Sequence, residues 1–129
     1  MLLLLDTCCL LWLVADQSGL SGKARQLIAR HAGSLYVSAI SAFEIALKCQ
    51  KGRLALPLDP EVWIERALAA HGVLDLPVTA RIAARAAMLP PLHADPCDRI
   101  VIATAQFHGA VILTPDPLIH AYPGVQVRW

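Results

Sequence analysis

Short apolar runs alternate with longer helical patterns from one end of the chain to the other, and this alternation sets the fold class. Strands that alternate with helices predict a mostly parallel sheet with helices on both faces. We therefore expect a three-layer α/β/α fold with a central sheet of four to five strands. The runs with the length of buried strands are Leu2–Leu5, Leu35–Val37, Val73–Leu76, Val111–Leu113 and Val125–Arg128.

Capping residues, prolines and glycines mark where the intervening helices begin and end. Ser21 can cap one helix, and either Ser38 or Ser41 can cap the next. Pro96 opens a long, almost wholly apolar helix that runs to about residue 108, where Gly109 ends it. We find no repeat or linker, and we treat residues 1–129 as a single domain.

Composition limits the partners of the chain. Apolar residues make up 57% of the 129 residues and charged residues only 16%. A chain this apolar is expected to leave an apolar patch that a second copy or another protein covers. The net charge of +1 argues against strong non-specific clamping of nucleic acid, which usually needs a basic excess.

Several common sites and locations are disfavoured by the sequence. The glycine-rich nucleotide-binding loops GxGxxG and GxxxxGK[ST] are absent, and the four cysteines form no CxxC pair that would suggest zinc. The apolar N-terminus lacks a basic start, is interrupted by Asp6, and is too short to cross a bilayer. We expect a cytoplasmic protein with reduced thiols and no membrane association.

Acidic side chains fall where the strands of the predicted sheet end. Asp6 follows the first strand, Asp116 follows the fourth, and Glu44 lies in the helix after the second. Asp95 and Asp98 open the helix that returns to the fourth strand, so they belong at the same edge. Such a cluster of carboxylates suits one or two magnesium or manganese ions, which prefer oxygen ligands and can hydrolyse a phosphodiester.

Each of these acids also has a possible structural role. Glu44 has capping-box spacing from Ser41 and stands four residues before Lys48, a favourable pair on a helix. The remaining acids occupy positions typical of helix caps, a helix first turn or a tight turn: Asp6, Asp95, Asp98 and Asp116. Only their shared place at one edge of the sheet favours a site.

The sequence around these acids resembles PIN-domain proteins, in particular the VapC-type toxins of bacterial type II toxin–antitoxin pairs. The blocks VSAISAFEIALK and HADPCDRIVIATA are specific, and their order and spacing strengthen the match. The matching stretches are 3–7, 37–48, 93–105, 113–116 and 125–129.

The resemblance implies a Mg²⁺- or Mn²⁺-dependent endoribonuclease that acts on RNA, forms a homodimer and is held inactive by a cognate antitoxin. Asp6 and Asp98 would be metal ligands, while Glu44 and Asp116 would act directly or through water. Asp95 is assigned to helix capping, with a supporting role near the site as the alternative. Residues that flank this set and could position waters are Thr7, Ser38 and Thr114.

Other residues near the motifs have weaker expectations. Lys48, Lys51 and Arg53 form a short basic run that could contact the RNA backbone, although for any one of them we favour a solvated helix face. We expect Arg99 to brace a carboxylate, and we favour a structural hydrogen bond over catalysis for His93.

The residue at position 8 bears on two alternatives to the nuclease function. A phosphohydrolase with an aspartyl nucleophile needs a second Asp two residues after the first, and Cys8 stands there instead. Many PIN-domain relatives have Asn at this place, so Cys8 also leaves open a non-catalytic PIN-fold module that binds RNA or protein. If Cys8 only packs beneath the site, the nuclease prediction is unaffected.

Overall fold

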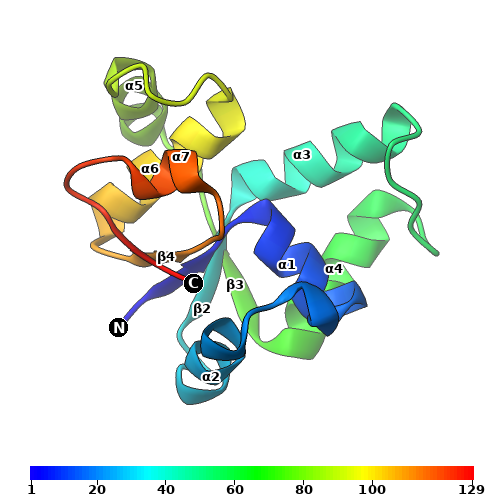
Figure 1. Cartoon of the computed structure of the whole chain (residues 1–129). Helices are drawn as coiled ribbons and strands as arrows, with labels where there is room; N and C mark the ends of the chain where they lie inside the picture. Colours follow the sequence, from blue (N-terminus) through cyan, green and yellow to red (C-terminus); the bar gives the residue numbers. More distant parts are fainter.

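The sheet at the centre of the computed structural model has five strands in the order β3-β2-β1-β4-β5 (Figure 1). All four neighbouring pairs are parallel, as the alternation of strands and helices predicts. The structure describes all residues from 1 to 129. The strands are β1 (Leu3–Leu5), β2 (Leu35–Ser38), β3 (Val73–Leu76), β4 (Val111–Leu113) and β5 (Gln126–Arg128).

The strand order reverses beside β1. From β1 the chain first builds outward through β2 and β3, and then returns to place β4 and β5 on the other side. Leu5 pairs with Val37 on one side and with Leu113 on the other. Open parallel sheets bind their ligands at such a reversal, outside the carboxyl ends of the strands.

Alternate residues of β1 face different helical layers. Leu3 and Leu5 pack with residues of α1, α2 and α4, whereas Leu4 packs with residues of α6 and α7. Figure 1 shows α1, α2 and α4 grouped apart from α5, α6 and α7, and α5 contacts α6. The helices are α1 (Thr7–Ala15), α2 (Gly22–Arg30), α3 (Ala39–Gln50), α4 (Pro60–His71), α5 (Ala80–Met88), α6 (Pro96–His108) and α7 (Pro117–His120), with a 3₁₀ turn at Gln17–Gly19.

The caps of α3 correct one expectation. The Ser38 side chain accepts a hydrogen bond of 3.2 Å from the backbone N–H of Ile40, so Ser38 caps this helix. Ser41 lies inside α3 and is fully buried, where its hydroxyl accepts a 2.9 Å hydrogen bond from Thr7. The capping box between Ser41 and Glu44 is therefore wrong, because the helix has already begun.

The N-terminal apolar segment forms β1 and α1 inside the fold. The helix begins at Thr7, because the Asp6 side chain caps it. None of the helices has both the length and the apolar character that crossing a bilayer demands.

Candidate metal centre

A cleft of about 430 Å³ opens at the carboxyl ends of β1 and β4. Every acid of the predicted set lines it, although the acids come from separate segments of the chain. The residues around the cleft are Asp6, Thr7, Cys8, Glu44, Lys48, Asp95, Asp98, Pro115, Asp116 and Pro117. The sequence therefore placed these carboxylates at the correct edge of the sheet.

Asp6 is buried at the floor of the cleft. One carboxylate oxygen accepts a 2.7 Å hydrogen bond from the backbone N–H of Cys9, and the other accepts one from the Thr114 hydroxyl. Burial raises the pKa of Asp6 to about 6, although both hydrogen bonds oppose the rise. The carboxylates of Asp116 and Glu44 add a smaller upward push on this pKa.

Asp98 lies in the first turn of α6 and lines the same cleft as Asp6. Burial raises its pKa to about 7, and the neighbouring charge of Asp95 raises it further. His93 lowers this pKa, while Glu44 and Asp116 raise it. The charges of several acids from separate segments therefore act on the Asp98 carboxyl.

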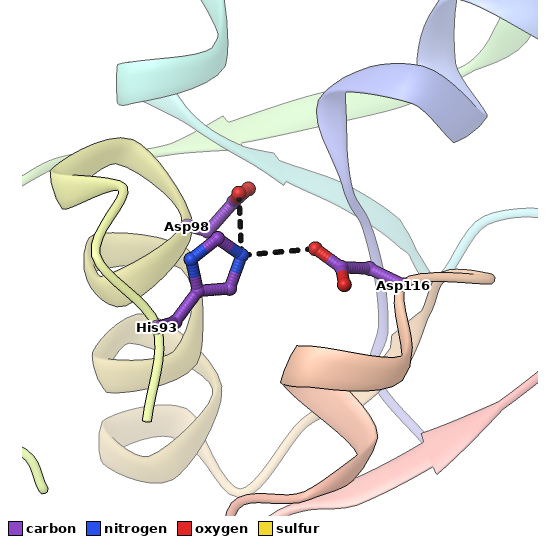
Figure 2. A group of neighbouring side chains, drawn as sticks. All are labelled: His93, Asp98 and Asp116. Atoms are coloured by element: carbon purple, nitrogen blue, oxygen red, sulfur yellow. Dashed lines mark hydrogen bonds and ion pairs between the residues drawn. The ribbon is translucent and has the colours of Figure 1, made fainter. Parts of the chain in front are cut away.

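Asp116 caps α7, a short helix that the sequence analysis did not predict. One of its carboxylate oxygens accepts a 2.9 Å hydrogen bond from the backbone N–H of Leu118. The other lies 2.9 Å from Nε2 of His93, which also lies 2.9 Å from a carboxylate oxygen of Asp98 (Figure 2). His93, Asp98 and Asp116 are thus close enough together to hold a metal ion.

His93 was expected to make only a structural hydrogen bond, and the structure gives it a place between two acids of the site. It lies in the loop before α6 and is buried. The HADPCD motif contained the residue, but nothing local in the sequence connects it to Asp116, which lies 23 positions away.

The expectation that Arg99 braces a carboxylate is wrong. Its guanidinium donates to the backbone carbonyls of Ala87, Leu89, Pro90 and His93, at distances between 2.8 and 3.2 Å. These carbonyls belong to the end of α5 and to the loop that leads to α6. Arg99 therefore holds this loop rather than the acids.

The residues expected to flank the site do so by capping and hydrogen bonding. Asp95 caps α6 by accepting a 2.8 Å hydrogen bond from the N–H of Cys97, as predicted. Thr114 is fully buried, donates to Asp6 and accepts a 3.1 Å hydrogen bond from the N–H of Asp116. Thr114 thereby links two of the acids, whereas Thr7 and Ser38 make the contacts described above.

The basic run beyond Glu44 is divided by the fold. Lys48 lines the cleft, and its ammonium nitrogen lies 3.8 Å from a carboxylate oxygen of Glu44. Lys51 and Arg53 are exposed beyond the end of α3 and do not line the cleft. Cys8 is exposed and lines the cleft, so the expectation that it packs beneath the site is wrong; partial desolvation and the charge of Asp6 raise the pKa of its thiol.

The donor set fits a hard divalent cation. Five carboxylates border one cleft, and burial raises the pKa values of Asp6 and Asp98, a cost that a bound cation would relieve. Asp6, Asp98, Glu44 and Asp116 all line this cleft. Oxygen-only sets of this kind suit magnesium or manganese rather than zinc.

Comparison with known proteins agrees with the architecture. The family model described as PIN domain matches residues 3–124. The chain belongs to the PIN-domain family. Ribonuclease VapC22 of Mycobacterium tuberculosis (strain ATCC 25618 / H37Rv) is 36% identical to this PIN domain over 98% of the chain and 97% of its own length.

Solved structures share the same PIN fold. A toxin–antitoxin complex from Klebsiella pneumoniae contains a chain 26% identical, with a TM-score of 0.64, covering 95% of this chain and 93% of that one. DNA-bound VapBC from Salmonella typhimurium has a TM-score of 0.72 at 16% identity, with coverage of 99% and 98%. VapBC2 from Rickettsia felis, bound to a promoter DNA fragment, has a TM-score of 0.75 at 12% identity, with coverage of 99% and 98%.

Proposed function

We propose that this PIN domain is a Mg²⁺- or Mn²⁺-dependent endoribonuclease and the toxin of a type II toxin–antitoxin pair. The observation that carries the proposal is the convergence of Asp6, Glu44, Asp98 and Asp116 on one cleft at the strand-order reversal. The likeness to a VapC ribonuclease over nearly the whole chain supports the same activity. RNA substrates and four free cysteines fit a cytoplasmic location.

The residues of the cleft would have different roles in phosphodiester hydrolysis. A divalent ion, when bound, activates water and offsets the charge that develops on the phosphate. Asp6 and Asp98 would hold the ion, and Glu44 would orient the attacking water. Lys48, the basic residue of the cleft wall, would contact an RNA phosphate beside the acids.

Cleavage of a structured RNA tests this function. Wild type with Mn²⁺ should cleave, chelator should stop cleavage, and Asp6→Asn and Asp98→Asn should each reduce the rate at least a hundredfold. Asp75→Asn is the matched control, because Asp75 is an exposed acid of β3 outside the cleft. Equal cleavage by wild type and Asp6→Asn would show that another site, or a contaminant, cuts the RNA. RNA binding without cleavage would instead favour a non-catalytic PIN module.

A second groove supports the antitoxin as partner. It has a volume of about 460 Å³, and apolar side chains from α1, β2, α3 and α4 line it. The acids Glu61, Glu65 and Asp75 border this groove. We propose that it receives an apolar antitoxin segment carrying Arg or Lys, because such a segment matches both the lining and the charge.

Charge reversal tests this partner surface. Glu65→Lys should weaken binding of the small protein encoded beside the toxin by at least tenfold and leave RNA cleavage unchanged. Arg81→Glu, on α5 away from the groove, is the control.

Light scattering should show a homodimer of the free toxin, since apolar side chains such as Phe43, Leu74 and Met88 are exposed on one chain. A monomer with no co-purifying partner would count against both associations.

A further inference from the structure

The two ring nitrogens of His93 have different hydrogen-bond roles. Nδ1 accepts the backbone N–H of Asp95 at 3.2 Å, so Nδ1 must offer a lone pair and carries no proton. In the neutral ring the proton therefore sits on Nε2. The hydrogen-bond network thus assigns His93 the Nε2–H tautomer.

This Nε2–H points between two acids of the cleft. It lies 2.9 Å from Oδ2 of Asp98 and 2.9 Å from Oδ2 of Asp116. Figure 2 shows the imidazole edge directed at both carboxylates, one on α6 and the other at the start of α7. The Nε2–H thus makes its hydrogen bond to Asp116, and the same nitrogen is in close contact with the Asp98 carboxylate from a different element.

The backbone around His93 is held as firmly as its ring. Its N–H donates to the Tyr122 hydroxyl at 2.9 Å, and its carbonyl accepts from Arg99 at 3.2 Å. The Tyr122 hydroxyl in turn donates to the carbonyl of Pro90 at 2.7 Å. Tyr122 is buried and packs with core residues of α6 and α7, so the hydrogen bonds that hold the His93 backbone are anchored in the core.

We propose that His93 is a positioning residue that holds the carboxylates of Asp98 and Asp116 in the orientation needed to bind the metal ion, and that it is not itself a metal ligand. This inference rests on the proposed nuclease function. Metal ligation by Nε2 would require its lone pair, and the proton would then have to move to Nδ1, where the Asp95 N–H already points. The network therefore opposes ligation and favours an Nε2–H that donates to Asp116 and stays in contact with Asp98.

Loss of the His93 Nε2–H donor should lower the affinity for the metal ion. In His93→Ala the two carboxylates have no donor between them, and their repulsion would turn them apart. Removal of a partner that orients a metal ligand commonly costs ten- to a hundredfold in metal affinity. His93→Gln keeps an amide N–H at about the position of Nε2, so it should retain most of the affinity.

The test measures Mn²⁺ affinity by calorimetry on the full chain, with thermal unfolding of each variant as a check of folding. We expect His93→Ala to bind Mn²⁺ at least tenfold more weakly than wild type and His93→Gln within about threefold. Tyr122→Phe, which loses only a hydroxyl that never touches the acids, should weaken binding measurably through the His93 loop. Tyr36→Phe is its control, because Tyr36 packs against the same core layer without contacting His93.

Three results would overturn the inference while leaving the nuclease function standing. The first is equal Mn²⁺ affinity in wild type and His93→Ala. The second is an Nδ1–H tautomer of His93 in ¹⁵N NMR spectra of the metal-free protein. The third is a directly bound nitrogen in the pulsed EPR spectrum of the Mn²⁺ complex, which would make His93 a ligand. If wild type binds no divalent ion at all, the proposed function fails first and the inference fails with it.

Discussion

Asp6 is kept at the floor of the cleft at the expense of stability. Its pKa rises to about 6 in the folded protein, from an ordinary value of 3.8, chiefly because it is buried. The folded state therefore holds the proton more tightly than the unfolded state. The contribution of Asp6 to stability is therefore greatest below about pH 4 and is lost as the pH rises through about 6, by on the order of 3 kcal/mol.

Asp6→Asn should therefore stabilise the metal-free protein. The amide oxygen can still accept the N–H of Cys9, while the buried charge is removed. Urea unfolding at pH 8 should show a gain of about 1–3 kcal/mol that shrinks toward pH 4, together with loss of Mn²⁺ binding. A variant that is less stable than wild type at pH 8 would show that the carboxylate is needed for folding.

Thr114 should tune the acid beside it. Its hydroxyl donates to Asp6 and lowers the pKa of that carboxyl, so Thr114→Val should raise the pKa further. Mn²⁺ binding to Thr114→Val should be about tenfold weaker at pH 7 and should recover partly at pH 9. Thr114→Ser keeps the hydroxyl and should behave as wild type. Equal weakening in both variants would point to packing instead.

The positions of the acidic residues could be predicted from the sequence better than the hydrogen-bond partners of the residues around them. Asp6, Asp98 and Asp116 could be placed because each follows a strand or opens a helix that returns to the same edge. The roles of His93 and Arg99 could not be predicted, because their partners lie on the far side of a loop or 23 residues away. Hydrogen bonds between distant segments leave no periodic signal in a sequence.

Local signals predicted some helix boundaries and missed others. Asp95, Pro96 and Gly109 bound α6 as expected, with Gly109 in the left-handed conformation. The short helix α7 was missed, because Asp116 between two prolines is equally typical of a turn. Ser38 rather than Ser41 caps α3, since strand pairing of β2 decides where the helix can begin.

One element junction depends on a glycine for a steric reason. Gly19 ends the 3₁₀ turn after α1, and a Cβ atom there would overlap the indole ring of Trp12. That indole packs against Trp129, with ring centroids 5.6 Å apart and planes at 47°. The contact joins the first helix to the last residue of the chain, so it links elements that the sequence separates widely.

Gly19→Ala should destabilise the protein by about 1–3 kcal/mol, because Trp12 must move out of its packed position. Gly22→Ala is the matched control, since a Cβ at the start of α2 meets nothing within 4 Å. Its effect should be a gain of about 0.4–1 kcal/mol, from the smaller entropy of the unfolded chain. Urea midpoints, with an unchanged dependence on denaturant, measure both. Similar midpoints for the two variants would mean that the Trp12 contact yields without strain.

The strand order of the sheet brings the acidic residues of the cleft together. The return of the chain to β4, beside β1, places Asp116 near Asp6, although 110 positions separate them. Parallel pairing then directs both residues to one edge, and the antiparallel run of α6 brings Asp98 there too. The fold class and this edge follow from the alternation of strands and helices. The order of the strands depends on long-range pairing, which the sequence analysis did not specify.

Because the acids belong to separate elements, a bound ion should stabilise the entire fold. Mn²⁺ at a hundred times its dissociation constant should add about 2.7 kcal/mol and raise the melting temperature by on the order of 10 °C at pH 8. With pKa values of about 6 for Asp6 and about 7 for Asp98, protons compete with the ion below neutrality. The same Mn²⁺ concentration should therefore give a much smaller rise at pH 5.5. Asp98→Asn should lose the rise and Asp75→Asn should keep it, in scanning calorimetry. A rise that is independent of pH, or that survives in Asp98→Asn, would place the ion outside this cleft.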